Sequence, residues 1–202
     1  MIGTTNVANA AAVTAQNDLT TAYNQAVGET PATTVPTELG GTTLTPGIYT
    51  SAAGTFGITG EVTLNGEGDP NAVFIFQMAS TLITASASSV DLINGANAAN
   101  VFWQVGSSAT LGTTTMFEGS ILALTSITLD TGATIECGRA LARNGAVTLD
   151  DNTVSVPVAG STACQAAPVP EPGTVTLLGM GIVVLSLILY RRQSRKPCFS
   201  AK

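Results

Sequence analysis

The sequence predicts a mainly β protein, a β-solenoid with one long α-helix packed alongside it and a transmembrane helix near its C-terminus. Three observations lead to this prediction. A repeat with a period of about 20 residues runs from 108 to 154, an alanine-rich amphipathic segment lies near the start, and an uncharged apolar run lies near the end. Together they place one folded body of about 158 residues ahead of a C-terminal membrane segment.

The repeat consists of two phrases that recur in step. Residues 109–112 return as 127–130 and again as 147–150, and residues 119–123 return as 138–142. Repetition at a fixed period of about 20 residues is typical of a solenoid, in which each coil covers the apolar face of the previous one. Aliphatic residues alternate with threonine in each phrase, which predicts short strands with aliphatic groups inside and hydroxyls outside.

Further strands are expected ahead of the repeat, at 56–58, 62–64, 72–77, 82–84 and 100–105. Two of them, 72–77 and 100–105, are apolar and aromatic without interruption, which predicts burial on both faces. Residues 66–71 read as a turn. The acids of this turn suggest calcium, but the ligand spacing of an EF-hand loop is missing, so we expect no metal site.

Near the start, apolar residues recur at three- and four-residue spacing and predict one amphipathic helix over about 6–27. The stripe consists of Ala12, Ala15, Leu19, Ala22, Tyr23 and Ala26. Either Asn6 or Asn9 fits the N-cap, and Gly28 fits the C′ position. A single amphipathic helix is not stable alone, so we expect the stripe to lie along the solenoid. Binding of a partner protein is the alternative use of this stripe.

Charge is scarce and unevenly distributed. Only 10% of the residues are charged while 45% are apolar, a combination that excludes ordinary disorder. All thirteen acids lie before residue 172, and the first 190 residues contain only two cations, Arg139 and Arg143. Such an acidic body repels phosphate backbones, so we expect no nucleic-acid partner.

The three cysteines are Cys137, Cys164 and Cys198. In a body outside the cytoplasm, Cys137 and Cys164 would form a disulfide that closes a loop of about 27 residues, worth about 2–4 kcal/mol. The alternative is two buried free thiols. The chain has no histidine and no CxxC pair, so we expect neither a zinc site nor another cofactor.

The C-terminal part changes character at a linker over 159–168. The uncharged run 173–190 would span roughly 27 Å as a helix, enough to cross a hydrocarbon core. Four cations, Arg191, Arg192, Arg195 and Lys196, follow it directly. They predict a cytoplasmic tail at 197–202 and a body outside the cytoplasm. A buried core helix is the alternative, but such a helix would not end in four cations.

The start of the chain conflicts with export. Met1 is followed by neither a basic n-region nor an apolar h-region, so no secretory signal is recognisable. We therefore expect the recorded start to lie inside the true gene product.

The C-terminal segment resembles the PEP-CTERM sorting signal of Gram-negative bacteria that make exopolysaccharide. The match covers 169–196 and begins with the motif Val169, Pro170, Glu171 and Pro172, followed by the short apolar run and the arginine-rich end. The resemblance implies an exosortase-type sorting enzyme as a partner. It also implies a single-pass membrane precursor whose body reaches the cell surface or is secreted after processing.

The body resembles the ice-binding protein family of bacteria and fungi. The matching phrases are 44–49, 68–77, 100–107 and 121–129, and their order covers about residues 8–156. The resemblance implies a right-handed β-helix of triangular section with one long helix alongside. Family members normally begin with a further strand segment before that helix, so an N-terminal segment is expected to be missing here.

The resemblance also implies a flat ice-binding face of small residues, in some members with a Thr-(Ala/Gly)-x-(Thr/Asn) pattern on successive coils. Residues 131–134 satisfy this pattern, whereas 84–87 and 113–116 depart from it, the latter through Met116. The candidate ice-binding residues are Thr84, Ser86, Thr113, Thr115, Thr131 and Thr134. Exposed threonine and serine also have high β propensity on any solvated solenoid.

Two other functions follow from the same fold. A surface or exopolysaccharide-matrix protein would use the solenoid as a rigid spacer without ice activity. An enzyme would need clustered carboxylates or bases. The adjacent acids Asp150 and Asp151 point to opposite faces of a strand, and Arg139 and Arg143 are the only bases of the body. We therefore predict no enzymatic activity.

Overall fold

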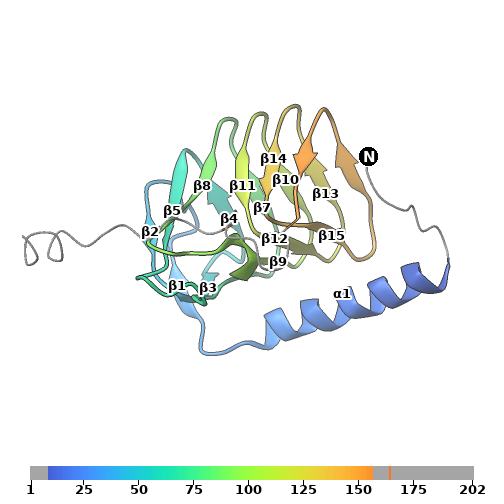
Figure 1. Ribbon diagram of the computed structural model, residues 1–202, viewed down its shortest axis with the longest axis horizontal. Coiled ribbons are helices and arrows are strands. Elements are labelled where there is room, and N and C mark those ends of the chain that lie inside the picture. Colours follow the sequence, from blue (N-terminus) through green and yellow to red (C-terminus); the bar gives the residue numbers. More distant parts are fainter. Residues whose placement is uncertain (1–8, 157–163, 165–202) are drawn as a thin grey trace, which may run out of the picture. The chain divides into compact units, whose positions relative to one another are not determined.

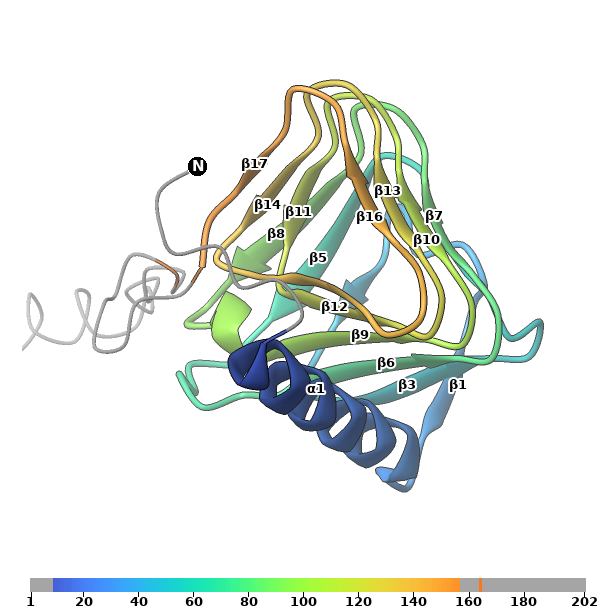
Figure 2. The same ribbon diagram turned by 90° about the vertical axis from the view of Figure 1, so that its right-hand side faces the viewer.

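The computed structural model describes residues 9–156 and residue 164. Within them one α-helix, one short 3-10 helix and seventeen strands are found. The strands form three parallel sheets, here called sheets A, B and C, which make the three sides of a triangular prism (Figures 1 and 2).

Each sheet takes one strand from each coil, except that the first coil contributes only the isolated bridge at Glu38 to sheet B. Sheet A contains, in spatial order, β1 (Thr33–Val35), β3 (Gly47–Ser51), β6 (Phe74–Met78), β9 (Val101–Val105), β12 (Ser120–Ala123) and β15 (Ala140–Ala142). Sheet B contains β4 (Phe56–Ile58), β7 (Leu82–Thr84), β10 (Ala109–Leu111), β13 (Ile127–Leu129) and β16 (Val147–Leu149). Sheet C contains β2 (Thr43–Leu44), β5 (Glu61–Asn65), β8 (Ser89–Ile93), β11 (Met116–Glu118), β14 (Thr134–Glu136) and β17 (Thr153–Val154). The 3-10 helix η1 (Ala98–Asn100) precedes β9.

The chain visits sheets A, B and C in turn, and the coils wind counterclockwise as they approach the viewer in Figure 2, which is the right-handed sense. The predicted solenoid is therefore confirmed. The sequence repeat equals one coil, because Leu111 pairs with Leu129 and Leu129 pairs with Leu149 across sheet B. The second phrase behaves in the same way in sheet A, where Leu122 pairs with Leu141.

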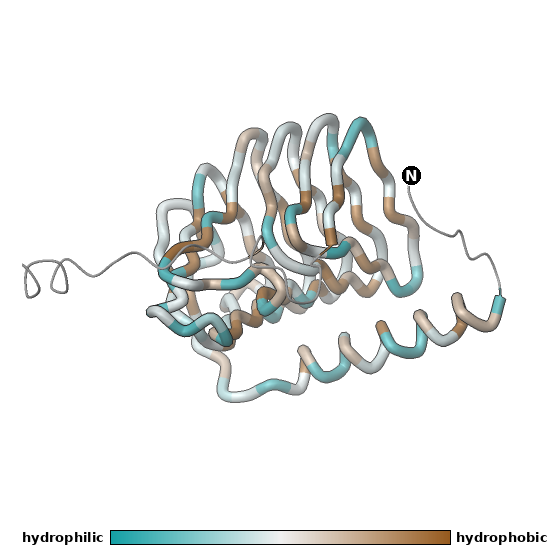
Figure 3. Tube along the Cα trace, viewed as in Figure 1, coloured by the Kyte–Doolittle hydropathy of each residue, from teal (hydrophilic) through white to brown (hydrophobic). Residues whose placement is uncertain are grey.

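The core fills the inside of the prism. Hydropathy alternates along the strands (Figure 3), with the apolar residues turned inward. Aromatic rings stack from coil to coil at its centre. Ring centroids are 5.5 Å apart for Tyr49 and Phe76, 3.9 Å for Phe76 and Trp103, and 5.0 Å for Trp103 and Phe117. Tyr49, Phe76 and Trp103 stack because the parallel register of sheet A places them one above the other, whereas Phe117 comes from sheet C and meets the Trp103 ring at a tilt of 50°.

The helix α1 (Ala10–Gly28) begins at the N-cap Asn9, whose side chain accepts a hydrogen bond from the Ala12 N–H at 2.9 Å. Asn9 is thus the N-cap of the two candidates. Gly28 is the last helical residue and Glu29 is the C-cap, so the helix runs one residue further than expected.

Half of the predicted stripe of α1 is buried on sheet A, while Ala15 and Ala22 are exposed. Leu19, Tyr23 and Ala26 are buried against Leu122. Ile75 of β6 and Phe102 of β9 are partly buried against this cluster from the outer face of the sheet. The inner faces of both aromatic strands are therefore fully buried and their outer faces partly buried, which confirms the prediction in part. The stripe is therefore used inside the protein.

Two glutamines on adjacent strands hold α1 in place. The Gln77 side chain donates to the carbonyls of Ala26 at 2.7 Å and Glu29 at 2.8 Å, which caps the end of the helix. Gln104 is buried and donates to the Tyr23 hydroxyl at 2.9 Å. These bonds fix the position of α1 along the solenoid axis, which apolar contacts alone do not specify.

We expect Gln77→Met to destabilise the protein by about 1–2 kcal/mol, because the two helix-end carbonyls lose their donor while the apolar stem of the side chain is kept. Thermal or urea unfolding measures the loss. Gln25→Met, on the helix itself, is the control and should change stability little. Equal effects of the two substitutions would contradict a capping role of Gln77.

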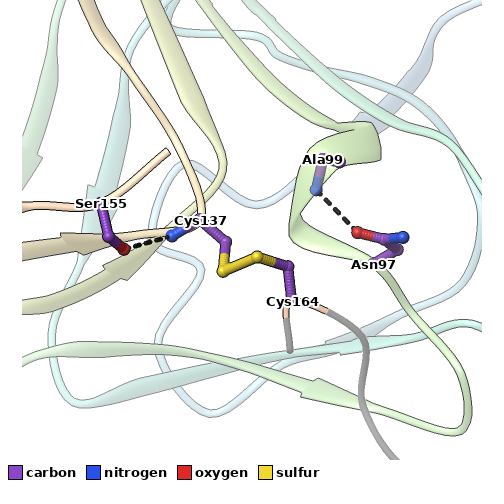
Figure 4. The surroundings of a disulfide bond; sticks show 5 residues. All are labelled: Asn97, Ala99, Cys137, Ser155 and Cys164. Carbon is purple, nitrogen blue, oxygen red and sulfur yellow. Dashed lines mark hydrogen bonds between the residues drawn. A yellow bond between two sulfur atoms is a disulfide. The ribbon is translucent and has the colours of Figure 1, made fainter. Parts of the chain in front are cut away.

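The structure contains the predicted disulfide between Cys137 and Cys164, whose Cα atoms are 5.5 Å apart (Figure 4). Among the described residues, no helix has the length and apolarity needed to cross a membrane. The predicted membrane helix 173–190 and the sorting motif 169–172 lie outside the described residues.

Candidate functional site

A solenoid of triangular section offers three outer faces. Sheet A is covered by α1, whose buried residues pack against it (Figure 2). A flat ligand can therefore reach only sheets B and C, and the two differ in charge.

Sheet C carries a row of carboxylates. Glu118 on β11 pairs with Glu136 on β14. Met116 pairs with Ser89, and continuing this register by two residues places Glu118 beside Asp91 of β8. Met116 itself is 60% exposed on the same face. Three acids in one row and a protruding thioether make sheet C both charged and uneven.

Glu118 has an unusual titration. Burial raises the pKa of its carboxyl to about 7, and the carboxylates of Glu136 and Asp91 act in the same direction. A raised pKa means that the folded protein binds this proton more tightly than the unfolded chain does. The contribution of Glu118 to stability is therefore fully present below pH 4.5 and is lost as the pH rises through about 7.

Glu118→Gln is accordingly expected to stabilise the protein above pH 7 by about 1–2 kcal/mol, after allowance for solvent screening. At pH 4 the substitution should make almost no difference, because the carboxyl is then protonated in both states. Urea unfolding at the two pH values measures the effect. Glu61→Gln, on the same sheet but outside the row, is the control. A gain from Glu118→Gln that did not change with pH would contradict this explanation.

Sheet B presents an uncharged outer row. Its strands alternate, so that the middle residue of each points outward. The pairing register aligns these middle residues in the order Gly57, Ile83, Thr110, Thr128 and Thr148. Neighbouring parallel strands lie about 4.8 Å apart, so the three threonines repeat at that spacing on consecutive coils.

A second row of small polar residues runs beside the first. Thr55, Thr81, Ser108 and Ser126 stand one residue before β4, β7, β10 and β13, and Ala146 takes this position before β16. The backbone ladder includes them, because each carbonyl of Thr81, Ser108 and Ser126 accepts from the strand of the preceding coil. Strand alternation turns both rows to the same side. We call these two rows the sheet B face.

Carboxylates lie only at the margins of this face among the described residues. Glu38 bridges Gly57 at the first coil, where its carboxylate accepts from the N–H groups of Gly40 and Thr59. Asp130 and Asp150 follow β13 and β16 at the corner with sheet C. The centre of the sheet B face is thus free of ionised groups.

The structure corrects the prediction for two of the candidate ice-binding residues. Thr84 and Thr115 are buried, with 3% and 1% exposure. Their hydroxyls hydrogen-bond each other at 2.8 Å, and the Thr84 hydroxyl also accepts from the Gly112 N–H. They stabilise the corner between sheets B and C from inside, where a bound crystal cannot reach them.

The other four candidates do not share one face. Ser86 and Thr113 are exposed on the turns between sheets B and C. Thr131 is exposed beside them and its hydroxyl donates to the Asp150 carboxylate. Thr134 lies on sheet C, paired with Met116 and with Thr153. The four-residue pattern therefore follows the corner of the prism.

The sequence contained a signal for the sheet B face. It is the middle residue of the repeated phrase, which is threonine in all three copies, at 110, 128 and 148. For a metal site the described residues offer no group of three or more histidine, cysteine, aspartate or glutamate side chains suited to hold an ion.

Comparison with known proteins confirms both resemblances. Residues 1–155 match the family described as Ice-binding-like, and residues 168–196 match the PEP-CTERM protein-sorting motif. A relative named ice-binding protein from Nostoc sp. (strain HG1) is 51% identical over 201 residues, 96% of this chain and 71% of the relative. An ice-binding protein from Colwellia sp. is 44% identical, over 71% of this chain and 56% of the relative.

Solved structures agree with the sequence matches. An ice-binding protein from an Antarctic biological consortium has a TM-score of 0.71 and 50% identity, covering 75% of this chain and 68% of its own. The ice-binding protein of the Antarctic ascomycete Antarctomyces psychrotrophicus has a TM-score of 0.70 and 42% identity, covering 75% and 74%. Fold, sequence and family model agree, and the chain belongs to the Ice-binding-like family.

Proposed function

We propose that this protein binds ice through the sheet B face. The observation that carries the proposal is the in-register row Thr110, Thr128 and Thr148, flanked by the second row of threonine and serine. Relatives of the family carry the name ice-binding protein, which supports this use of the face.

The chemistry of the face suits ordered water. A threonine hydroxyl both donates and accepts hydrogen bonds, while its methyl group excludes bulk water next to it. Ionised carboxylates hold their own hydration shells tightly, so the row of Glu118, Glu136 and Asp91 makes sheet C a poor match to a crystal. The parallel ladder keeps the hydroxyls at regular spacing without a change of shape on binding.

The C-terminal match also supports a proposal for how the protein is exported and sorted. We infer that the sorting motif at 168–196 directs the chain to an exosortase-type enzyme after export. In this proposal the run 173–190 crosses the membrane, the tail 197–202 stays in the cytoplasm, and processing leaves the body at the cell surface or secreted.

Ice activity tests the proposal. The body, residues 1–168, should show thermal hysteresis and inhibit ice recrystallisation. No activity at high micromolar concentration would refute ice binding.

That negative result would leave the surface or exopolysaccharide-matrix protein as the function. One observation favours it: the threonine row occupies only three of the five strands of sheet B, and Ile83, which is 54% exposed, ends the row next to Thr110. On this alternative the solenoid is a spacer and the sheet B face has no ligand.

A further inference from the structure

The disulfide ties Cys164 to one corner of the folded body. Cys137 follows β14 directly, at the corner where sheet C meets sheet A. Its partner Cys164 is held there a second time, because the Ala98 N–H of η1 donates to the Cys164 carbonyl at 3.0 Å. Figure 4 shows η1 next to the disulfide. Two independent contacts thus fix residue 164 at this corner.

The corner itself is tightly built. Gly119 has φ of 93°, and a Cβ on Gly138 would lie 1.8 Å from the Gly119 carbonyl oxygen. Two consecutive coils therefore turn from sheet C to sheet A through stacked glycines. At this corner the backbone of one coil packs directly on the backbone of the next, which leaves the residues next to the disulfide little room to move.

In a triangular prism, the corner between two sheets lies opposite the third sheet. The corner between sheets C and A is therefore the edge farthest from sheet B, as the axial view shows (Figure 2). Cys164 and the sheet B face consequently lie on opposite sides of the body.

The sequence between Cys164 and the sorting motif is short. The sorting motif begins at residue 168, and the four residue steps from 164 to 168 span at most about 14 Å even when fully extended. Without the disulfide, the steps would count from residue 156, after β17, and could span about 40 Å. The disulfide thus shortens the reach of the body from the start of the sorting motif by about threefold.

We propose that the Cys137–Cys164 disulfide orients the body. It holds the corner between sheets C and A toward whatever surface retains the sorting segment, and it turns the sheet B face away from that surface toward the surroundings. This inference rests on the proposed function for its purpose, because an ice-binding face must point away from the cell to meet a crystal. The orientation itself can be measured without ice.

The body can be studied alone, since the chain divides into two compact units, Met1–Pro168 and Val169–Lys202. The chain has no histidine, and its lysines are Lys196 and Lys202. A histidine tag placed directly after Pro168 is therefore the single attachment to phosphatidylcholine vesicles that contain nickel-chelating lipid. A single introduced lysine carries the donor dye, and the α-amino group is acetylated so that it does not react with the dye. The acceptor dye is attached to lipid head groups.

Two donor positions in adjacent coils form a matched pair, Arg139→Lys beside the corner and Thr128→Lys on the sheet B face. With the disulfide intact, energy transfer to the lipid should be stronger from position 139 than from 128. The difference should be lost when both cysteines are changed to serine. It should also be lost when a long Gly-Ser linker follows Pro168, a variant that leaves the folded body unchanged.

Equal energy transfer to the lipid from positions 139 and 128, with the disulfide intact, would overturn the proposal. So would a difference that persists unchanged in the linker variant, because tether length would then not set the orientation. Thermal hysteresis of the untagged body in solution is measured separately. A body without ice activity that still shows the transfer difference would refute the proposed function and leave the orientation standing.

Discussion

Thr128→Tyr is expected to abolish thermal hysteresis and the inhibition of ice recrystallisation. Thr128 is the centre of the threonine row, paired with Thr110 on one side and Thr148 on the other. A phenol ring at this position would stand well above both neighbours and hold a crystal surface away from the whole row. Because the side chain points outward from sheet B, the fold should tolerate the change, and circular dichroism should remain that of the unmodified protein.

Thr63→Tyr is the matched control, since Thr63 is also a half-buried threonine in the middle of a strand, on sheet C. It should leave ice activity intact. Thr131→Tyr distinguishes the sheet B face from the corner that the four-residue pattern indicated. Loss of activity in Thr131→Tyr, with Thr128→Tyr still active, would move the binding surface to that corner.

Trp103→Ala is expected to have the largest effect on stability, a loss of about 3–5 kcal/mol in the free energy of unfolding. Trp103 is fully buried and stacks on Phe76 at 3.9 Å. Its indole N–H donates to the Glu118 carbonyl at 3.1 Å. Removal of the ring would leave a cavity in the middle coils and interrupt the aromatic stack. Urea unfolding followed by circular dichroism measures the loss.

Trp103→Phe is the control, because it keeps a ring against Phe76 and loses mainly the indole hydrogen bond. It should cost markedly less than the alanine substitution. If both substitutions destabilised the protein equally, the hydrogen bond to Glu118 rather than the stack would be the main contribution of Trp103.

Much of the fold was predictable from the sequence because it depends on local spacing. One coil equals one repeat, so the period predicted the solenoid, and the pairing of Leu111 with Leu129 confirms it. The apolar spacing predicted that the stripe on α1 lies along the solenoid, but not which sheet it covers. The two cysteines of the body predicted the disulfide, but not the corner at which it lies.

The candidate site was only partly predictable. Thr84 and Thr115 look like surface residues in the sequence, yet they are buried in a hydrogen-bonded corner. Thr84 is the last residue of β7 and follows the strand alternation inward with Leu82, whereas Thr115 stands in the turn before β11, where strand alternation does not apply. The raised pKa of Glu118 was likewise outside the reach of sequence, because Glu136 and Asp91 approach it from neighbouring coils.

The sequence by itself determined the coil length, the inward aliphatic positions, the family and the sorting motif, because each depends on residues close together in the chain. Only the tertiary structure decided which hydroxyls share a face. Each face is built from successive coils, whose equivalent residues are about 20 positions apart in the sequence. Which side chains share a face therefore depends on the strand register and on the turns at the three corners. Thr110, Thr128 and Thr148 meet because the parallel ladder aligns them, while the residues of the four-residue pattern lie where the backbone turns.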